Sequence, residues 1–155
     1  MAYGITTGGK LKLGKRGDDL RMMATFGQGL GRYLAGNFIA GSAVEENGGL
    51  KPIGSLNGYV AYNHFWLKEK LSSSFSLAGF QAFNDNKLVG PEANDVAFSV
   101  SGNLKYDPVP ALRLGVEYMY AYRGLEGGVS GSFHRIQFAA KYQFGYVNEA
   151  AYEKL

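Results

Sequence analysis

The chain of 155 residues contains no cysteine and no long apolar run. The lack of cysteine excludes a disulfide scaffold, a thiolate metal site and a cysteine nucleophile. No stretch approaches the roughly 18 to 20 consecutive apolar residues that a membrane-spanning helix needs. A membrane-spanning β-strand is not excluded on this ground, because only every second residue of such a strand has to be apolar.

The composition is skewed toward glycine and aromatic residues. There are 23 Gly, 11 Tyr and 10 Phe, against only 4 Pro and 1 Trp, and this bias favours many strands joined by turns. The formal net charge of +3 is mildly basic. Nucleic-acid binding would require this charge to cluster on one surface, and no nucleic-acid partner is expected.

The run from residue 135 to residue 144 alternates between apolar and polar side chains. One face would carry Ile136, Phe138, Ala140, Tyr142 and Phe144, and the other Arg135, Gln137, Ala139, Lys141 and Gln143. Successive side chains of a strand point to opposite faces, so one face is apolar and the other is polar and basic. A strand between lipid and water requires this pattern, although a strand of a soluble sheet can also have it.

Similar alternation predicts seven strands in total. The other six runs lie near residues 2–15, 20–26, 56–66, 71–83, 96–106 and 112–122. Their connections at 16–19, 67–70 and 107–110 are short, whereas those at 27–52, 84–95 and 124–131 are longer. Short turns at one end and long loops at the other are typical of outer-membrane barrels. Gly79 and Phe80 break the alternation of the fourth run, which predicts a β-bulge there.

The aromatic residues fall into two groups along the predicted strands. Those beside the short turns are Trp66, Tyr106, Tyr142 and Phe144, and those near a long loop are Tyr118, Tyr120 and Tyr122. Two aromatic belts are expected where a barrel crosses both membrane interfaces. Together with Phe98 and Phe138, these residues are predicted to face lipid or to lie in the belts.

The charged residues at the polar positions of the runs are mostly cationic. They are Lys10, Lys12, Arg21, Lys105, Arg113, Glu117, Arg123, Arg135 and Lys141. In a water-filled barrel they would attract small anions, because low-dielectric walls focus the field of the charges. The solvated face of a soluble sheet would carry similar residues, so this alternative stays open. Arg113 and Glu117 lie four positions apart on one strand face, and an ion pair between them is a further expectation.

No catalytic constellation is recognised in the sequence. The serines at 72–74 have no His or Asp in their sequence context to suggest a triad. The glycines at 27, 29 and 31 lack the spacing and the following helix of a nucleotide-binding fingerprint. His64 and His134 have no carboxylate cluster nearby and are interpreted as interface positions rather than metal ligands. We therefore expect no enzyme activity, no cofactor and no metal.

Several local strings stand out in order along the chain. They are Gly29-Leu30-Gly31-Arg32-Tyr33-Leu34, Gly58-Tyr59-Val60-Ala61-Tyr62 with His64-Phe65-Trp66, Asp107-Pro108-Val109-Pro110, Gly115-Val116-Glu117-Tyr118-Met119-Tyr120, and the run 135–144. Over residues 18–144 the chain resembles the C-terminal half of DcaP-type outer-membrane porins. The resemblance implies trimers of large barrels that pass small anionic solutes such as dicarboxylates. The seven runs amount to about half of such a barrel, and residues 145–155 follow the terminal aromatic residue Phe144.

The sequence therefore predicts an all-β fold, an antiparallel up-and-down transmembrane β-barrel with about eight strands in this chain. This is either half of a larger porin barrel or a small closed barrel. Residues 1–144 would form the barrel region, and residues 145–155 would form a C-terminal extension. The leading function is passive diffusion of small anionic solutes across the bacterial outer membrane, with lipid, the solutes and further copies of the chain as partners. A small structural or adhesive outer-membrane barrel and a soluble ligand-binding barrel are the alternatives.

Overall fold

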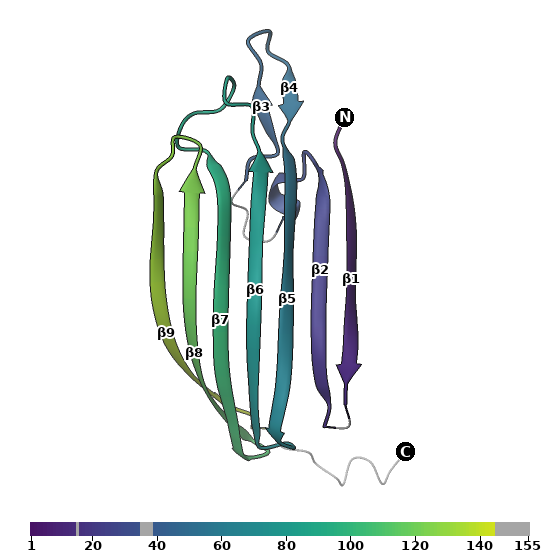
Figure 1. Ribbon diagram of the computed structural model, residues 1–155, viewed down its shortest axis with the longest axis vertical. Helices are drawn as coiled ribbons and strands as arrows, with labels where there is room; N and C mark the ends of the chain where they lie inside the picture. The colour runs from purple at the N-terminus through teal and green to yellow at the C-terminus, as the bar shows by residue number, and fades with distance from the viewer. Residues whose placement is uncertain (15, 35–38, 145–155) are drawn as a thin grey trace, which may run out of the picture.

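The computed structural model describes residues 1–14, 16–34 and 39–144, and its main feature is a seven-stranded antiparallel sheet (Figure 1). The strands are β1 (Tyr3–Leu13), β2 (Asp18–Gln28), β5 (Gly54–Leu67), β6 (Leu71–Phe83), β7 (Asn94–Val109), β8 (Leu112–Leu125) and β9 (Ser130–Tyr142). Each of these strands pairs with the next one along the chain. The connection between β2 and β5 holds a 3-10 helix, η1 (Gly31–Tyr33), and a hairpin of β3 (Ser42–Val44) and β4 (Leu50–Pro52).

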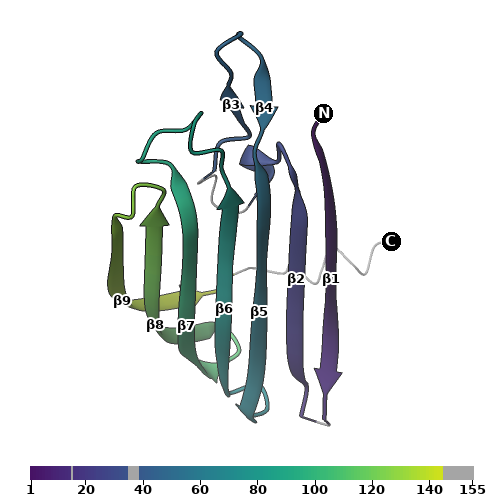
Figure 2. The same cartoon turned by 45° about the horizontal axis from the view of Figure 1, so that its top comes forward.

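The seven predicted strands and the up-and-down antiparallel order are confirmed. The sheet is open in both views (Figures 1 and 2), because β1 and β9 stand at opposite edges and do not pair with each other. An open sheet agrees with part of a larger barrel and not with a small closed one. No helix among the described residues is long and apolar enough to cross a membrane. Residues 145–155, predicted to be an extension, lie outside the described residues.

The predicted alternation of connection lengths is confirmed for two of the three longer connections, because the connection at 126–129 has only four residues, as many as that at 14–17. The connections at 14–17, 68–70 and 110–111 join strands at what we call the short-turn end. Those at 29–53, 84–93 and 126–129 lie at the opposite end, the long-loop end (Figure 1). In the turn at 68–70 Glu69 adopts a left-handed conformation with φ of 62°, which lets the chain reverse within three residues.

Two local expectations were wrong. The predicted bulge at Gly79 is absent, because the register of β6 runs without a shift past this residue against both neighbours. Gly79 lies opposite Gly58. The apolar–polar alternation of the sequence is interrupted there because glycine has no side chain, while the backbone pairing continues. The predicted turn at 107–110 is also shorter, because β7 continues to Val109 through an irregularity between Tyr106 and Val109.

The register divides the sheet into two chemically different faces. One row of paired residues crosses all seven strands and is entirely polar: Lys12, Asp19, Asn63, Ser74, Asn103, Glu117 and Gln137. We call the face that carries this row the polar face. The apolar face carries the row Leu11, Leu20, Tyr62, Phe75, Gly102, Tyr118 and Ile136.

The buried apolar core lies on the polar face at the long-loop end. It consists of Leu34, Ile39, Ala43, Ile53 and Ala82, with Leu30, Phe80, Leu88 and Val89 packed against it. Ala82 and Phe80 point to the polar face of β6, so the connection between β2 and β5 folds over that face. The three connections at the long-loop end together form what we call the cap.

Polar contacts join the three connections of the cap. Lys51 Nζ lies 2.8 Å from Asp85 Oδ2, which ties the hairpin to the connection at 84–93. Asn84 Nδ2 donates to Glu126 Oε1 at 2.7 Å, and the Glu126 amide donates to the Ala93 carbonyl at 3.0 Å. These contacts tie the connection at 84–93 to that at 126–129, so polar contacts link all three connections of the cap.

Candidate functional site

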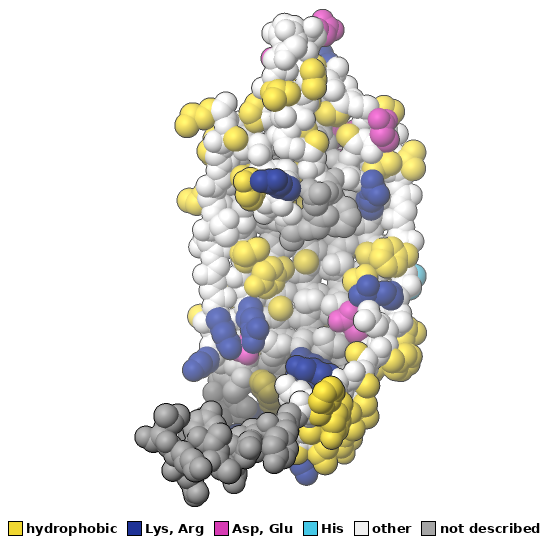
Figure 3. Space-filling model, turned by 180° about the vertical axis from the view of Figure 1, so that it is seen from behind, with side chains coloured by type: hydrophobic (Ala, Val, Ile, Leu, Met, Phe, Trp, Pro, Cys, Tyr) yellow, Lys and Arg dark blue, Asp and Glu magenta, His cyan; other side chains and the backbone are white. Residues whose placement is uncertain are grey.

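All nine residues of the predicted solute path lie on the polar face. They are Lys10, Lys12, Arg21, Lys105, Arg113, Glu117, Arg123, Arg135 and Lys141, and the register places each in line with residues of that face on the adjoining strand. Figure 3 shows Lys and Arg side chains on this face, most of them toward the short-turn end. The structure thus brings together residues from five strands that are distant in sequence.

The polar row is connected by side-chain hydrogen bonds near the middle of the sheet. Asn63 Nδ2 donates to Asp19 Oδ1 at 2.8 Å, and Ser74 Oγ donates to Asn63 Oδ1. Lys105 Nζ donates to Ser74 Oγ at 2.8 Å, and Asn103 accepts from the Ser74 amide at 3.1 Å. These bonds hold the side chains of four adjacent strands in fixed positions on the polar face.

Three carboxylates, which form four ion pairs, neutralise part of the positive charge. Asp19, which is only 4% exposed, accepts from Arg21 Nε at 2.7 Å and lies 3.4 Å from Lys10 Nζ. Arg135 Nη2 lies 3.2 Å from Glu117 Oε1. Arg113 donates from Nε and Nη2 to the two carboxylate oxygens of Asp107, at 2.7 and 2.8 Å. This is the bidentate geometry of strong arginine–carboxylate pairs.

The expected ion pair between Arg113 and Glu117 is not formed. Residues four apart along a strand are about 13 Å apart, at 3.3 Å per residue. Side chains on adjoining strands are much closer, with Cβ atoms about 4.5–5.5 Å apart when directly opposite. Glu117 therefore pairs across strands with Arg135, and Arg113 pairs with Asp107 at the end of β7.

Four cations of the predicted path remain without a carboxylate partner in the described part of the chain. Lys12 and Lys141 make neither an ion pair nor a side-chain hydrogen bond there, Lys105 bonds only to a serine hydroxyl, and Arg123 bonds to the amide oxygen of Asn94. Their charge is therefore free to act on mobile anions. An anion close to them would exchange water for charge-assisted hydrogen bonds.

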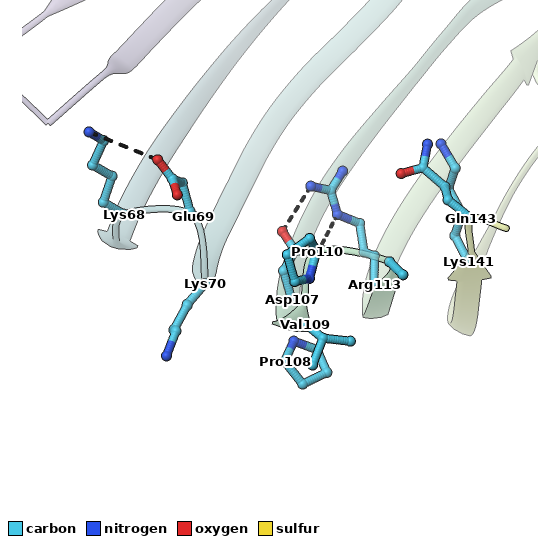
Figure 4. Close-up of a pocket in the computed structure, with 11 residues that line it drawn as sticks. Lys68, Glu69, Lys70, Asp107, Pro108, Val109, Pro110, Arg113, Lys141 and Gln143 are labelled. Atoms are coloured by element: carbon cyan, nitrogen blue, oxygen red, sulfur yellow. Dashed lines mark hydrogen bonds and ion pairs between the residues drawn. The ribbon is translucent and has the colours of Figure 1, made fainter. Parts of the chain in front are cut away.

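A pocket of about 540 Å³ opens where two short turns meet the ends of β8 and β9. Figure 4 shows that Arg113 turns toward Asp107, while Lys141 and Gln143 stand beside each other on the adjoining segment. Lys68 and Glu69 of the neighbouring turn form a loose pair at 3.9 Å. The pocket thus carries cations from one turn, Lys68 and Lys70, and from two strands, Arg113 and Lys141, at the short-turn end of the polar face.

The apolar face carries the residues predicted to contact lipid. Seven of them lie on this face by register: Phe98, Tyr106, Tyr118, Tyr120, Tyr122, Phe138 and Tyr142. Trp66 lies at an irregularity of β5 and donates from Nε1 to Ser73 of the same face at 3.1 Å, and Phe144 lies beyond the end of β9. Tyr118 lies in the middle of β8, farther from the loop at 126–129 than Tyr120 and Tyr122. Phe75 and Phe138 are 57% and 78% exposed, so no other part of the described chain covers this face.

The two histidines lie on the apolar face and make polar contacts there. His64 Nδ1 lies 2.8 Å from Asp18 Oδ2, and Tyr62 donates its hydroxyl to the same oxygen at 2.9 Å. His134 Nδ1 lies 2.7 Å from the Tyr118 hydroxyl. Among the residues that the structure describes, no three His, Asp or Glu side chains gather as metal ligands would.

Asp19 and Asp107 were missed by the sequence interpretation, although both touch the predicted path. Both were assigned to turns, since charged and proline-containing strings at strand ends favour turns. In the structure β2 already begins at Asp18 and β7 ends only at Val109. The alternation itself was the signal available: Asp19 has the parity of Arg21, and Asp107 has the parity of Lys105.

Comparisons with known proteins bear on the fold. No protein-family model matches the chain, and no curated protein matches it. Among solved structures, the outer membrane channel DcaP of Acinetobacter baumannii matches with a TM-score of 0.83 and 24% sequence identity. The match covers 92% of this chain and 41% of that chain, so the chain spans less than half the length of the channel. The expected structural likeness to about half of a DcaP-type barrel is confirmed.

Proposed function

We propose that this chain forms part of the wall of an outer-membrane, porin-like barrel for passive, non-enzymatic diffusion of small anionic solutes. The observation that carries the proposal is the segregation of the two faces. All nine predicted path residues share the polar face, and the predicted lipid-facing residues that lie within strands share the other. The fold shared with an outer membrane channel supports the same proposal.

The membrane location rests on the exposed apolar face. Large apolar side chains lie uncovered along its strands, among them Ile5 at 69% and Ile136 at 65% exposed. A contiguous apolar surface of this kind needs a lipid or protein partner. A soluble ligand-binding barrel would turn this face inward, yet the cap packs against the polar face instead. These observations favour outer-membrane lipid of a Gram-negative bacterium as the partner of the apolar face.

The seven strands would be only one part of the complete barrel. Strands β1 and β9 both run from the long-loop end to the short-turn end (Figure 1). Adjoining strands of an outer-membrane barrel are antiparallel, so β9 cannot close directly onto β1. An odd number of further strands has to stand between them. We propose that such strands complete the pore and that complete pores associate with copies of themselves through the apolar face.

The direct test is single-channel conductance in planar lipid bilayers under a salt gradient. The path cations should make the conductance anion-selective, because their summed potential concentrates anions and depletes cations. Replacing Arg113 and Arg135 by Gln should move the reversal potential toward cation preference. Each substitution also leaves a carboxylate, Asp107 or Glu117, without its cation. Raising the salt to 1 M should weaken the selectivity, since the screening length falls to about 3 Å.

The matched control replaces Arg32 and Lys87 by Gln. This change removes the same charge from the cap, away from the predicted path residues. A pore whose selectivity ignores Arg113 and Arg135 but responds to the control would have its path elsewhere. The lack of conductance in every oligomeric form would overturn the proposal in favour of a small structural or adhesive outer-membrane barrel.

A further inference from the structure

Charge is distributed unevenly along the strands. The register joins Lys10, Arg21 and Arg135 in one row, and we call this row and everything between it and the short turns the short-turn half. Five described anions lie there: Asp18, Asp19, Glu69, Asp107 and Glu117. Six anions lie in the other half: Glu45, Glu46, Asp85, Glu92, Asp95 and Glu126.

The cations have the opposite distribution. Only Arg32, Lys51, Lys87 and Arg123 lie in the long-loop half, whereas the remaining ten described cations lie in the short-turn half. The described residues therefore carry a formal charge of +5 in the short-turn half and −2 in the long-loop half. Eight of the nine predicted path residues belong to the short-turn half, and Arg123 is the exception.

The two halves act on mobile ions separately. A strand of 13 residues, such as β9, is roughly 43 Å long at 3.3 Å per residue. The screening length is about 10 Å at 0.1 M salt and about 3 Å at 1 M. An ion at the short turns is thus influenced by the positive half, and an ion at the cap is influenced by the negative half. The salt concentration at each end therefore sets how strongly the charges of that end alone attract or repel mobile ions.

We propose that the short-turn half of the polar face is a vestibule that collects multiply charged anions and makes the path directional. The inference rests on the proposed function. Anions accumulate at the short-turn end because Lys12, Lys105 and Lys141 lack carboxylate partners there in the described chain. Anions that arrive from the long-loop side first meet the net negative cap. Anion selectivity is therefore greater when dilute salt bathes the short-turn end than when it bathes the long-loop end.

The first test measures binding of the fluorescent trisulfonate pyranine to the detergent-solubilised chain at low salt. The test variant replaces Lys12 and Lys141 by Gln. Neither side chain makes an ion pair or a side-chain hydrogen bond in the described chain, so the fold should survive. Pyranine affinity should fall roughly 5- to 20-fold for two lost charges. The matched variant, Arg32→Gln with Lys87→Gln, should change the affinity for pyranine by no more than about twofold. Equal losses in both variants would overturn the vestibule.

The second test reverses a salt gradient of 0.1 M against 1 M across channels of known orientation. The reversal potential should be larger in magnitude when the dilute solution bathes the short-turn end. Lys12→Gln with Lys141→Gln should reduce this difference, and Arg32→Gln with Lys87→Gln should not. An anion-selective pore with equal reversal potentials in both directions would refute the inference and leave the proposed function standing. If no form conducts, the proposed function fails, and the pyranine comparison alone decides whether the vestibule binds anions.

Discussion

Val116 lies on the apolar face of β8, opposite Leu104 on one side and Phe138 on the other. If this face contacts lipid, an arginine here has to reach the headgroups or stay in hydrocarbon. We predict that Val116→Arg lowers the free energy of unfolding in lipid vesicles by roughly 2 to 4 kcal/mol, the cost near a bilayer midplane. The matched variant is Ala139→Arg, on the polar face of β9, which should stay within about 0.5 kcal/mol. A cost below about 0.5 kcal/mol for Val116→Arg would contradict the placement.

Asp19 is the most buried charged residue of the polar face. Its carboxylate pairs with Arg21 and Lys10 and accepts a hydrogen bond from the Asn63 amide. Asp19→Asn removes the negative charge that these three groups contact. We predict a loss of roughly 1 to 3 kcal/mol in the free energy of unfolding. Pyranine affinity should rise roughly two- to fivefold, because one anion is removed from the vestibule.

Glu117→Gln separates these two effects of Asp19→Asn. It removes the same charge from a more exposed ion pair, with side chains 47% and 32% exposed. Exposed pairs contribute at most about 1 kcal/mol. This variant should therefore raise pyranine affinity to a similar extent with little loss of stability. Equal destabilisation by both variants would show that Asp19 has no special structural role.

The hairpin of β3 and β4 is the element that stands farthest from the sheet at the long-loop end (Figure 1). Glu46 near its tip is exposed, and so is Glu69 in a turn at the opposite end. We predict that a glutamate-specific protease added outside intact cells cuts at Glu46 and spares Glu69, because long loops of such barrels face outward. The same protease on solubilised protein should reach both residues. Cleavage at Glu69 in intact cells would show that the short turns, and not the long loops, face outward.

The contact of Lys51 with Asp85 joins two elements of the cap and depends on pH. The hydrogen bond from Lys51 lowers the pKa of Asp85 below its ordinary value of 3.8, aided by the Lys87 amide. The same bond raises the pKa of Lys51 above 10.5. The Asp85 contribution is fully present above pH 3.8 and is lost as the pH falls through the lowered pKa. The Lys51 contribution is fully present below pH 10.5 and is lost as the pH rises through the raised pKa.

The distance between spin labels at positions 46 and 86 should therefore be narrowly distributed between about pH 4 and pH 10 and broaden outside this window. The chain has no native cysteine, so labels can be attached to introduced ones without interference. Lys51→Gln should broaden the distribution at every pH. A distribution that does not change with pH in the unmodified pair would show that this contact does not hold the hairpin.

At the scale of the whole molecule, the two open edges of the sheet control association. Unpaired backbone groups in hydrocarbon cost several kcal/mol each, so the chain should not remain an open-edged monomer in micelles or vesicles. We predict a mass of two or more chains in detergent, with β1 and β9 amides protected from hydrogen exchange. A monomer with every edge amide protected would contradict the open sheet. A monomer with fast exchange at both edges would contradict the association only.

The sequence predicted the strands well because each had to satisfy two environments at once. The alternation in β8 and β9 placed Arg113, Glu117 and Arg135 on one face without any knowledge of pairing. The sequence could not predict which charges pair, because the partner of Arg135 is fixed by cross-strand register. It also could not predict the cap, since its core depends on Leu34, Ile53 and Ala82 meeting from three separate segments. Alternation reports on faces, whereas contacts between segments depend on register and loop geometry.

Gene duplication is a simple way to enlarge a barrel, and the direction of the two edges limits it here. A tandem copy of this unit would place β1 of the second copy beside β9 of the first, with both strands running the same way. Such barrels admit only antiparallel neighbours. A unit that repeats must therefore contain whole hairpins and an even number of strands, which seven strands do not provide. Further strands that complete such a barrel therefore cannot be a tandem duplicate of this seven-stranded sheet as a whole.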